Sequence, residues 1–124
     1  MASVLVVDDH EAFLIFVKHG LSRHGYHPVV ATSGKTALRL LETEPVEIAV
    51  IDVVMPDMDG IELLREIRRR RPSLPVIAMT GASDGLRQPV ATLLSVLGAC
   101  AVLIKPFAPA SLVVAIEDCL LAAR

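Results

Sequence analysis

The sequence lacks the features that would place it in a membrane or in a secretory pathway. It has no apolar run of the roughly 18–20 residues that a membrane-spanning helix needs, so we expect no insertion into a membrane. Its first residues, MASVLVVDDHEAF, carry no basic segment ahead of the short apolar run, which argues against a signal peptide. We therefore expect a cytoplasmic protein.

The chain also lacks an excess of charge of either sign. The net charge is −2 over 124 residues, which gives no electrostatic reason to expect direct binding to nucleic acid. A run of four arginines, Arg68–Arg71, is the one basic cluster. It closes a predicted helix, where cations favour the negative end of the helix dipole, and we interpret it as a solvated face.

Cysteine and histidine are scarce and unsuitably spaced for a metal site. The two cysteines, Cys100 and Cys119, lie far apart and outside any C-x-x-C pattern. This spacing favours two reduced, buried thiols over a disulfide or a metal site. The histidines show no spacing typical of metal ligands, and we interpret all of them as surface or loop residues: His10, His19, His24 and His27.

What the sequence does have is a regular alternation of short apolar runs with longer helical patterns. The apolar runs predict strands buried on both faces of a parallel sheet, at residues 3–7, 28–32, 47–51, 75–79 and 101–104. Helical spacing predicts helices between and after them, at about 10–24, 33–44, 59–71, 86–97 and 109–122. This order predicts one α/β domain over residues 1–124. We expect a doubly wound, five-stranded parallel (βα)5 sheet of flavodoxin-like order 2-1-3-4-5, with helices on both faces.

Polar residues follow four of the five predicted strands. They are Asp8 and Asp9 after the first strand, Asp52 after the third, Thr80 after the fourth and Lys105 after the fifth. Ligands of open α/β sheets bind beyond the carboxyl ends of the strands, so we expect these side chains to converge on one edge.

The residue types at that edge predict phosphoryl chemistry with a metal ion. Clustered carboxylates raise one another's pKa unless a cation lies among them, and oxygen ligands suit Mg²⁺. Asp52 can act as an oxygen nucleophile on phosphorus and form an aspartyl-phosphate. Lys105 would neutralise the developing charge, and the hydroxyl of Thr80 could donate to a phosphoryl oxygen.

Four motifs carry a resemblance to a known family: VVDD at 6–9, IDVVMPDMDG at 51–60, MTG at 79–81 and KPF at 105–107. Together they resemble the receiver domain of two-component response regulators, over essentially the whole chain. The resemblance implies that Asp52 is the phosphoacceptor. It also implies a cis Lys105–Pro106 bond, and a loop shaped by Met55, Pro56 and Gly60.

The resemblance assigns roles to the other residues at this edge. It implies that Asp9, Asp52 and the backbone carbonyl of Val54 bind Mg²⁺ directly, with Asp8 acting partly through water. Thr80 resembles the switch hydroxyl, and Lys105 resembles the phosphate-binding lysine.

The chain departs from the family pattern in three places. Val102 stands where many receivers have a tyrosine or phenylalanine that turns inward when the threonine binds phosphate, so the signal must travel otherwise. The glycine-containing stretch at 80–90 suggests a mobile switching segment beside the site. The last helix is more apolar than one buried face needs, and we expect it, with or without the fourth helix, to contribute to a homodimer or a partner-docking surface.

We interpret the chain as a stand-alone receiver that accepts a phosphoryl group from phosphohistidine on a histidine kinase or a histidine phosphotransfer protein. It would then regulate an unknown downstream protein, and we do not class it as an enzyme, because it catalyses only its own phosphorylation and dephosphorylation. Two alternatives stay open. One is a receiver-like binding module that works without phosphorylation. The other is a Mg²⁺-dependent phosphohydrolase with an aspartyl-phosphate, although DDHEA replaces the D-x-D-x-[TV] signature of those enzymes.

Overall fold

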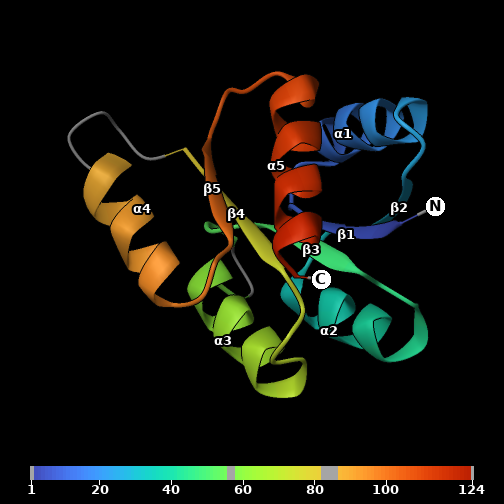
Figure 1. Ribbon diagram of the computed structural model, residues 1–124. Coiled ribbons are helices and arrows are strands. Elements are labelled where there is room, and N and C mark those ends of the chain that lie inside the picture. Colours follow the sequence, from blue (N-terminus) through green and yellow to red (C-terminus); the bar gives the residue numbers. More distant parts are fainter. Residues whose placement is uncertain (1, 56–57, 82–86, 124) are drawn as a thin grey trace.

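The computed structural model describes residues 2–55, 58–81 and 87–123, and within them five strands alternate with five helices (Figure 1). The strands are β1 (Ser3–Val7), β2 (His27–Ala31), β3 (Ile48–Asp52), β4 (Val76–Thr80) and β5 (Ala101–Ile104). The helices are α1 (Glu11–Arg23), α2 (Gly34–Thr43), α3 (Gly60–Arg70), α4 (Arg87–Val96) and α5 (Pro109–Ala122). The predicted order of elements is confirmed, with bounds close to the predicted ones.

The strands form one parallel sheet in the order β2-β1-β3-β4-β5, as predicted. The chain first adds β2 on one side of β1 and then crosses to add β3 on the other. Val6 accordingly pairs with Val30 of β2 on one side and with Val50 of β3 on the other. At such a reversal the connecting segments leave toward opposite faces and open a crevice at the carboxyl ends of the two central strands. The topology therefore places the residues that follow β1 and β3 at a binding crevice.

Helices cover both faces of the sheet (Figure 1). Successive strand residues point to opposite faces, so Val4 and Val6 join one apolar cluster and Leu5 and Val7 join the other. The first cluster packs beneath α1 and α5, and the second packs beneath α2, α3 and α4. The result is a three-layer α/β/α arrangement with a core on each side of the sheet.

Burial differs between the central and the edge strands. Every residue of β1, β3 and β4 is buried, which confirms the burial predicted from their nearly continuous apolar runs. The edge strands β2 and β5 are mostly half-buried, because one side of each has no neighbouring strand. The residues that end β3 and β4 thus lie on the buried, central part of the sheet.

Local signals in the sequence fix the helix ends. Ser33, where the predicted second helix begins, is the N-cap of α2 and accepts a hydrogen bond from the backbone N–H of Thr36. Asp59 does the same for α3, because its Oδ1 accepts from the N–H of Glu62 at 2.8 Å. After α4, Gly98 has φ of +102°, a left-handed conformation that favours glycine at the end of a helix.

Helix α5 is the longest described helix, with 14 residues. Its inner face buries Leu112, Ile116 and Cys119, while Val114 and Leu121 are exposed. Among the described helices, none combines the length and the apolar character that crossing a bilayer would require.

The cysteine prediction is wrong. A disulfide joins Cys100, which lies just before β5, to Cys119 on the inner face of α5, with the Cα atoms 6.0 Å apart. The two residues meet because α5 packs back across the beginning of β5. Sequence spacing alone did not reveal this, since the separation of 19 residues reflects a strand, a turn and most of a helix.

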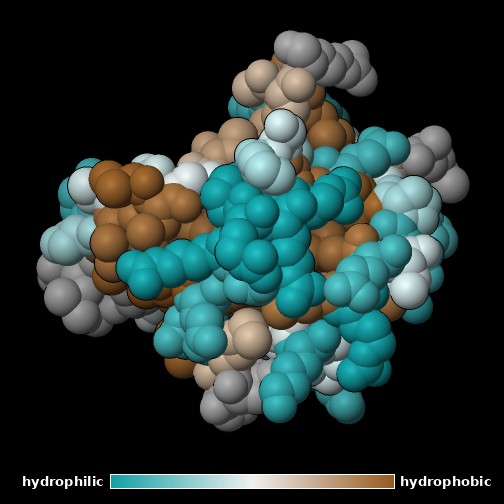
Figure 2. Space-filling model, turned by 90° about the horizontal axis from the view of Figure 1, so that it is seen from below, coloured by the Kyte–Doolittle hydropathy of each residue, from teal (hydrophilic) through white to brown (hydrophobic). Residues whose placement is uncertain are grey.

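The arginine run is only partly a solvated face. Arg69 and Arg70 are exposed and pair with Glu66 on the same helix. Arg68 instead donates three hydrogen bonds to backbone carbonyls, those of Pro72, Leu74 and Gly98, at 2.8–2.9 Å. It therefore ties the end of α3 to the loop before β4 and to the end of α4. Figure 2 views this end of the molecule, from below the orientation of Figure 1, and shows hydrophilic side chains gathered across it.

Candidate functional site

The residues predicted to converge do lie at one edge of the sheet. Asp52 and Thr80 are the last residues of β3 and β4, Asp8 directly follows β1, and Lys105 directly follows β5. The backbone N–H of Lys105 donates to the carbonyl of Thr80 at 2.8 Å, which continues the pairing of β4 with β5 by one step. The parallel register thus delivers a carboxylate, a hydroxyl and an ammonium group to the same place.

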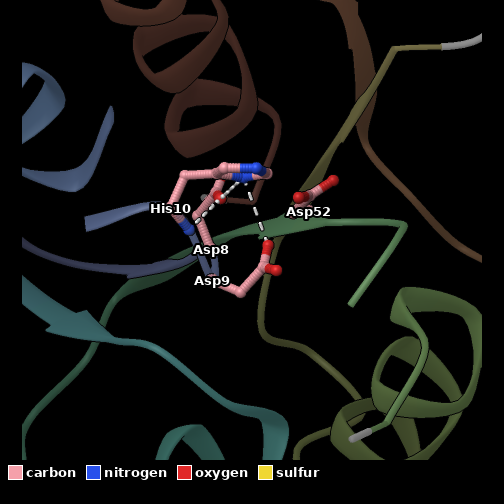
Figure 3. Close-up of side chains that lie close together, drawn as sticks. All are labelled: Asp8, Asp9, His10 and Asp52. Carbon is pink, nitrogen blue, oxygen red and sulfur yellow. Dashed lines mark hydrogen bonds and ion pairs between the residues drawn. The ribbon is translucent and has the colours of Figure 1, made fainter. Parts of the chain in front are cut away.

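The acidic side chains form a compact cluster, drawn in Figure 3. Asp8, Asp9, His10 and Asp52 each offer one donor atom, and these four atoms all lie within 4.8 Å of one another. Asp8 has no exposed side-chain surface, Asp52 is almost fully buried, and Asp9 is partly exposed at the rim. The cluster is therefore a small acidic pocket that opens to solvent on the side of Asp9 and His10.

Lys105 supplies the positive charge opposite this cluster. Its Nζ lies 2.6 Å from Oδ2 of Asp8 and 3.5 Å from Oδ2 of Asp52. The ammonium group also lies 4.3 Å from the centre of the Phe13 ring, which packs edge-to-face against Phe107. The cis Lys105–Pro106 bond implied by the family resemblance is present. An aromatic wall from α1 and two carboxylates thus hold the lysine over the site.

The carboxyl group of Asp52 is held in a defined orientation. Its Oδ1 accepts a hydrogen bond from the backbone N–H of Val54 at 3.2 Å, which leaves Oδ2 facing Lys105. Burial raises the pKa of Asp52 above its ordinary value, and the charge of Asp8 raises it further. The Val54 N–H and the Lys105 ammonium lower this pKa by less than the burial raises it. A cation bound in the pocket would therefore favour the ionised, nucleophilic form.

Gly60 determines how closely α3 approaches Asp52. The N–H of Gly60 donates to the carbonyl of Val53 at 2.7 Å. A Cβ atom at position 60 would lie 2.4 Å from both the carbonyl oxygen of Asp52 and Cα of Val53. Only glycine allows this contact, so the glycine that ends the MPDMDG motif fixes the loop after β3. Pro56 of the same motif lies outside the described residues.

A cavity of about 450 Å³ adjoins the acidic cluster. Asp52, Thr80 and Lys105 line its polar end, and Val54 lies at its rim with an exposed side chain. Its other wall is apolar and comes from α3 and α4. The cavity opens Asp52 to a ligand from solvent, and the Thr80 and Lys105 side chains lie at the same opening.

Two residues at the site were not predicted from the sequence. His10 is exposed as expected, but its Nδ1 lies 3.1 Å from Oδ1 of Asp8 and 3.3 Å from Oδ1 of Asp9. Its position directly after the aspartate pair was the available signal. Phe13 lies within the helix predicted at about 10–24, and nothing in its spacing shows that its ring contacts Lys105.

Val102 lies in β5 opposite Ala78 and packs, partly buried, against the cluster beneath α2, α3 and α4. Its side chain has no ring that could move between two positions, so the described part of β5 offers no aromatic relay at this position. The stretch expected to switch instead includes residues 82–86, which lie outside the described residues.

The donor set fits a hard cation. Three of the four donors are carboxylate oxygens, the ligand type that Mg²⁺ prefers. Within the described part of the chain, Oδ1 of Asp9 is shielded from solvent, and its polar contact is the one with Nδ1 of His10 at 3.3 Å, which is too poorly aligned to be a hydrogen bond. A shielded carboxylate oxygen of this kind is the observation expected where a cation is to bind.

Comparison with known proteins gives a family match. The family model of the response regulator receiver domain matches residues 4–117. The chain is 33% identical over 106 residues to the alkaline phosphatase synthesis transcriptional regulatory protein PhoP of Bacillus subtilis, covering 86% of this chain and 43% of that protein. It is 38% identical over 105 residues to response regulator MprA of Mycolicibacterium vanbaalenii, covering 85% of this chain and 44% of that protein. The chain thus spans less than half the length of these relatives.

Solved structures give the same result over the whole chain. The receiver domain of the Francisella response regulator 1452 has a TM-score of 0.91 and 29% sequence identity, and the match covers 100% of both chains. A response regulator receiver domain protein from Clostridium thermocellum has a TM-score of 0.89 and 31% identity, covering 98% of this chain and 96% of that one.

Proposed function

The chain belongs to the response regulator receiver domain family, and from this premise we propose that Asp52 is its phosphoacceptor. Receiver domains act as phosphoacceptors in two-component signalling. We choose Asp52 because its carboxylate differs from that of Asp8 in how closely Lys105 binds it. Asp8 is bound tightly by Lys105 at 2.6 Å, whereas Oδ2 of Asp52 lies 3.5 Å from the same ammonium group and faces the cavity.

The proposed reaction transfers the phosphoryl group directly to Asp52. A carboxylate oxygen of Asp52 attacks phosphorus, a P–O bond forms, and the P–N bond of the donor phosphohistidine breaks. The electron pair of that bond goes to the histidine nitrogen, which takes up a proton. Lys105 neutralises negative charge on the phosphoryl oxygens, and the hydroxyl of Thr80 donates to one of them.

We propose that Asp9, Asp52 and the backbone carbonyl of Val54 hold Mg²⁺ directly, with Asp8 acting partly through water. Oδ1 of Asp9 supports this assignment, because it is shielded from solvent and accepts no well-aligned hydrogen bond within the described residues. When bound, Mg²⁺ would neutralise charge on the transferring phosphoryl group. Lys105 holds the Asp8 carboxylate in place, and the Val54 N–H fixes the rotation of the Asp52 carboxylate.

We propose the partners and the location from what is typical of the family. Receiver domains partner with histidine kinases and with downstream effectors, and they are generally signalling modules and not enzymes. For this chain we propose a histidine kinase or histidine phosphotransfer protein as the donor, a protein as the downstream target, and a cytoplasmic location. We also propose that residues 1–124 act as one domain, which phosphorylates and dephosphorylates only itself.

We propose no direct contact with nucleic acid. The net charge of −2 supports this, and so do the contacts of the arginine run. Arg68 is bound to three carbonyls and Arg70 to Glu42 and Glu66, so these guanidinium groups are already engaged within the chain. A phosphate backbone would have to compete with those partners.

We propose that α5, with or without α4, contributes to a homodimer or to a surface that docks a partner. Val114 and Leu121 on α5, and Leu93 and Val96 on α4, are exposed apolar residues. Hydrophobic atoms are visible on the side of Figure 2 where α4 lies. Sedimentation at increasing concentration should show dimers that Val96→Glu removes. A clean monomer, with and without a phosphoryl mimic, would contradict the dimer.

Exposure to a small-molecule phosphodonor with Mg²⁺, followed by intact mass measurement, tests the phosphoacceptor. The wild-type chain should gain one phosphoryl group, and Asp52→Asn should gain none. Asp118→Asn, an exposed position on α5, is the matched control and should behave as wild type. An equal adduct on Asp52→Asn, or none on wild type, would contradict the proposal. Turnover of a generic phosphate ester would instead favour the phosphohydrolase alternative.

A further inference from the structure

We propose that His10 makes this site bind divalent transition-metal ions such as Ni²⁺ and Zn²⁺ in preference to Mg²⁺, by adding an imidazole nitrogen to the carboxylate ligands. This inference rests on the metal site proposed above and concerns the class of ion that it takes. In the described structure the imidazole lies over the two aspartates that precede it, on the side of Asp52 (Figure 3).

The backbone holds His10 where its ring can reach the pocket. His10 occupies the N-cap position of α1 in an extended conformation, with φ of −92° and ψ of 102°. Its N–H donates to Oδ1 of Asp8 at 2.9 Å, and its Nδ1 lies 3.1 Å from the same oxygen. Lys105 binds the other oxygen of Asp8, Oδ2, so the imidazole and the ammonium group each contact a different oxygen of this carboxylate.

The donor atoms are spaced so that they can all bind the same metal ion. Ligand atoms about 2.0–2.2 Å from a metal lie about 2.8–3.6 Å apart when adjacent, and about 4.0–4.4 Å apart when opposite. Nδ1 of His10 lies 3.1 Å from Oδ1 of Asp8 and 3.3 Å from Oδ1 of Asp9, which are both adjacent-ligand distances. All four donor atoms lie within 4.8 Å of one another, so they can share one ion after the side chains move inward.

The chemistry of imidazole then determines which metal ions the site binds more tightly. Imidazole nitrogen suits Ni²⁺, Zn²⁺ and Cu²⁺, whereas Mg²⁺ prefers carboxylate, carbonyl and water oxygens. Among the four donors, His10 alone supplies a nitrogen, and its side chain is 72% exposed. With Mg²⁺ the ring can turn into solvent at little cost, so the preference comes from added affinity for the softer ions.

Isothermal titration of the full chain with Ni²⁺, and separately with Mg²⁺, tests the inference in wild type, His10→Ala and His24→Ala. His10→Ala should weaken Ni²⁺ binding by about tenfold or more and leave Mg²⁺ binding unchanged. His24→Ala is the matched control, because His24 is also an exposed histidine at an end of α1, where its Nδ1 lies 2.9 Å from the Gly20 carbonyl. It should change neither affinity.

A direct readout is the ¹⁵N resonance of the His10 imidazole, which should shift at Nδ1 when Zn²⁺ is added and stay in place with Mg²⁺. An unchanged His10 resonance with Zn²⁺, or equal Ni²⁺ affinities in wild type and His10→Ala, would overturn the inference. If such a result is found while Mg²⁺ still binds and Asp52→Asn weakens Mg²⁺ binding, only the role of His10 is wrong. If neither ion binds wild type, or if Asp52→Asn leaves both affinities unchanged, the metal site itself fails and the inference with it.

Discussion

The ammonium nitrogen of Lys105 lies 2.6 Å from Oδ2 of Asp8, a carboxylate with no exposed side-chain surface. The two residues are 97 positions apart, and their strands are separated in the sheet by β3 and β4. A charge-assisted hydrogen bond of this length offsets the desolvation of Asp8. It also separates the two carboxylates: Asp8 anchors the lysine, and Asp52 keeps an oxygen for the phosphoryl group that we propose it accepts.

Asp52→Asn should be more stable than wild type at neutral pH. The folded-state pKa of Asp52 is raised, mainly by burial, so above the ordinary carboxyl pKa of 3.8 the folded protein holds an unfavourable charge. The stability of wild type should fall as pH rises from 3.8 through the folded pKa, and the variant lacks this loss. Thermal unfolding without metal should show a Tm a few degrees higher for the variant at neutral pH, and no difference below pH 3.8.

Asp118→Asn serves as the control for that experiment, because the side chain is exposed on α5. It should leave Tm unchanged at every pH. A Tm of Asp52→Asn below that of wild type at neutral pH would show that the charge of Asp52 is stabilising, contrary to the burial argument.

Gly60→Ala should damage both stability and metal binding. The added Cβ would meet backbone atoms of Asp52 and Val53 at 2.4 Å, and backbone cannot move aside as a flexible side chain can. We expect a loss of about 1–3 kcal/mol in the free energy of unfolding. Displacement of Asp52 should also reduce the rise in Tm that Mg²⁺ produces in wild type.

Gly81→Ala is the matched control for crowding, since a Cβ at that position meets nothing within 4 Å. If the two substitutions lower the free energy of unfolding in urea equally, the close contact of Gly60 with the end of β3 does not require glycine.

Arg68→Ala should destabilise the fold at the end opposite the site. The guanidinium donates to three carbonyls, and removal leaves those acceptors to water or unpaired, at a cost of about 2 kcal/mol. Arg65→Ala, an exposed position on the same helix, should change the free energy of unfolding little. If the two variants unfold at the same urea concentration, the three hydrogen bonds contribute nothing measurable.

Reduction of the Cys100–Cys119 disulfide should lower the free energy of unfolding by about 3 kcal/mol. The bond closes a loop with a sequence separation of 19, and chain-entropy models assign about this value to such a loop. The comparison is urea unfolding with and without a thiol reductant, in wild type and in Cys100→Ser. Only wild type should respond to the reductant; an equal response of the variant would point to some other effect of the reagent.

Much of this architecture could be predicted because its signals are local. The apolar runs predicted the strands. The ends of those runs then predicted where Asp8, Asp52, Thr80 and Lys105 lie. The parallel topology then brought these residues to one edge without further information.

The missed features depend on how side chains of different elements meet. Cys119 follows Leu112 and Ile116 at helical spacing, so its inward direction was readable, but its contact with Cys100 required the position of α5 over β5. The bonds of Arg68 depend likewise on where the loop after α4 passes the end of α3. The contacts of His10 depend on the rotation of one side chain at the N-cap of α1, and a sequence pattern does not predict such a rotation.

The location of the phosphoryl group tests the central claim most directly. After treatment with a small-molecule phosphodonor and Mg²⁺, borohydride reduces an aspartyl-phosphate to homoserine, and peptide mass spectrometry then identifies the modified position. The account predicts homoserine at position 52 and at no other aspartate. Homoserine at position 8 or 9, or none in the phosphodonor-treated chain, would contradict it.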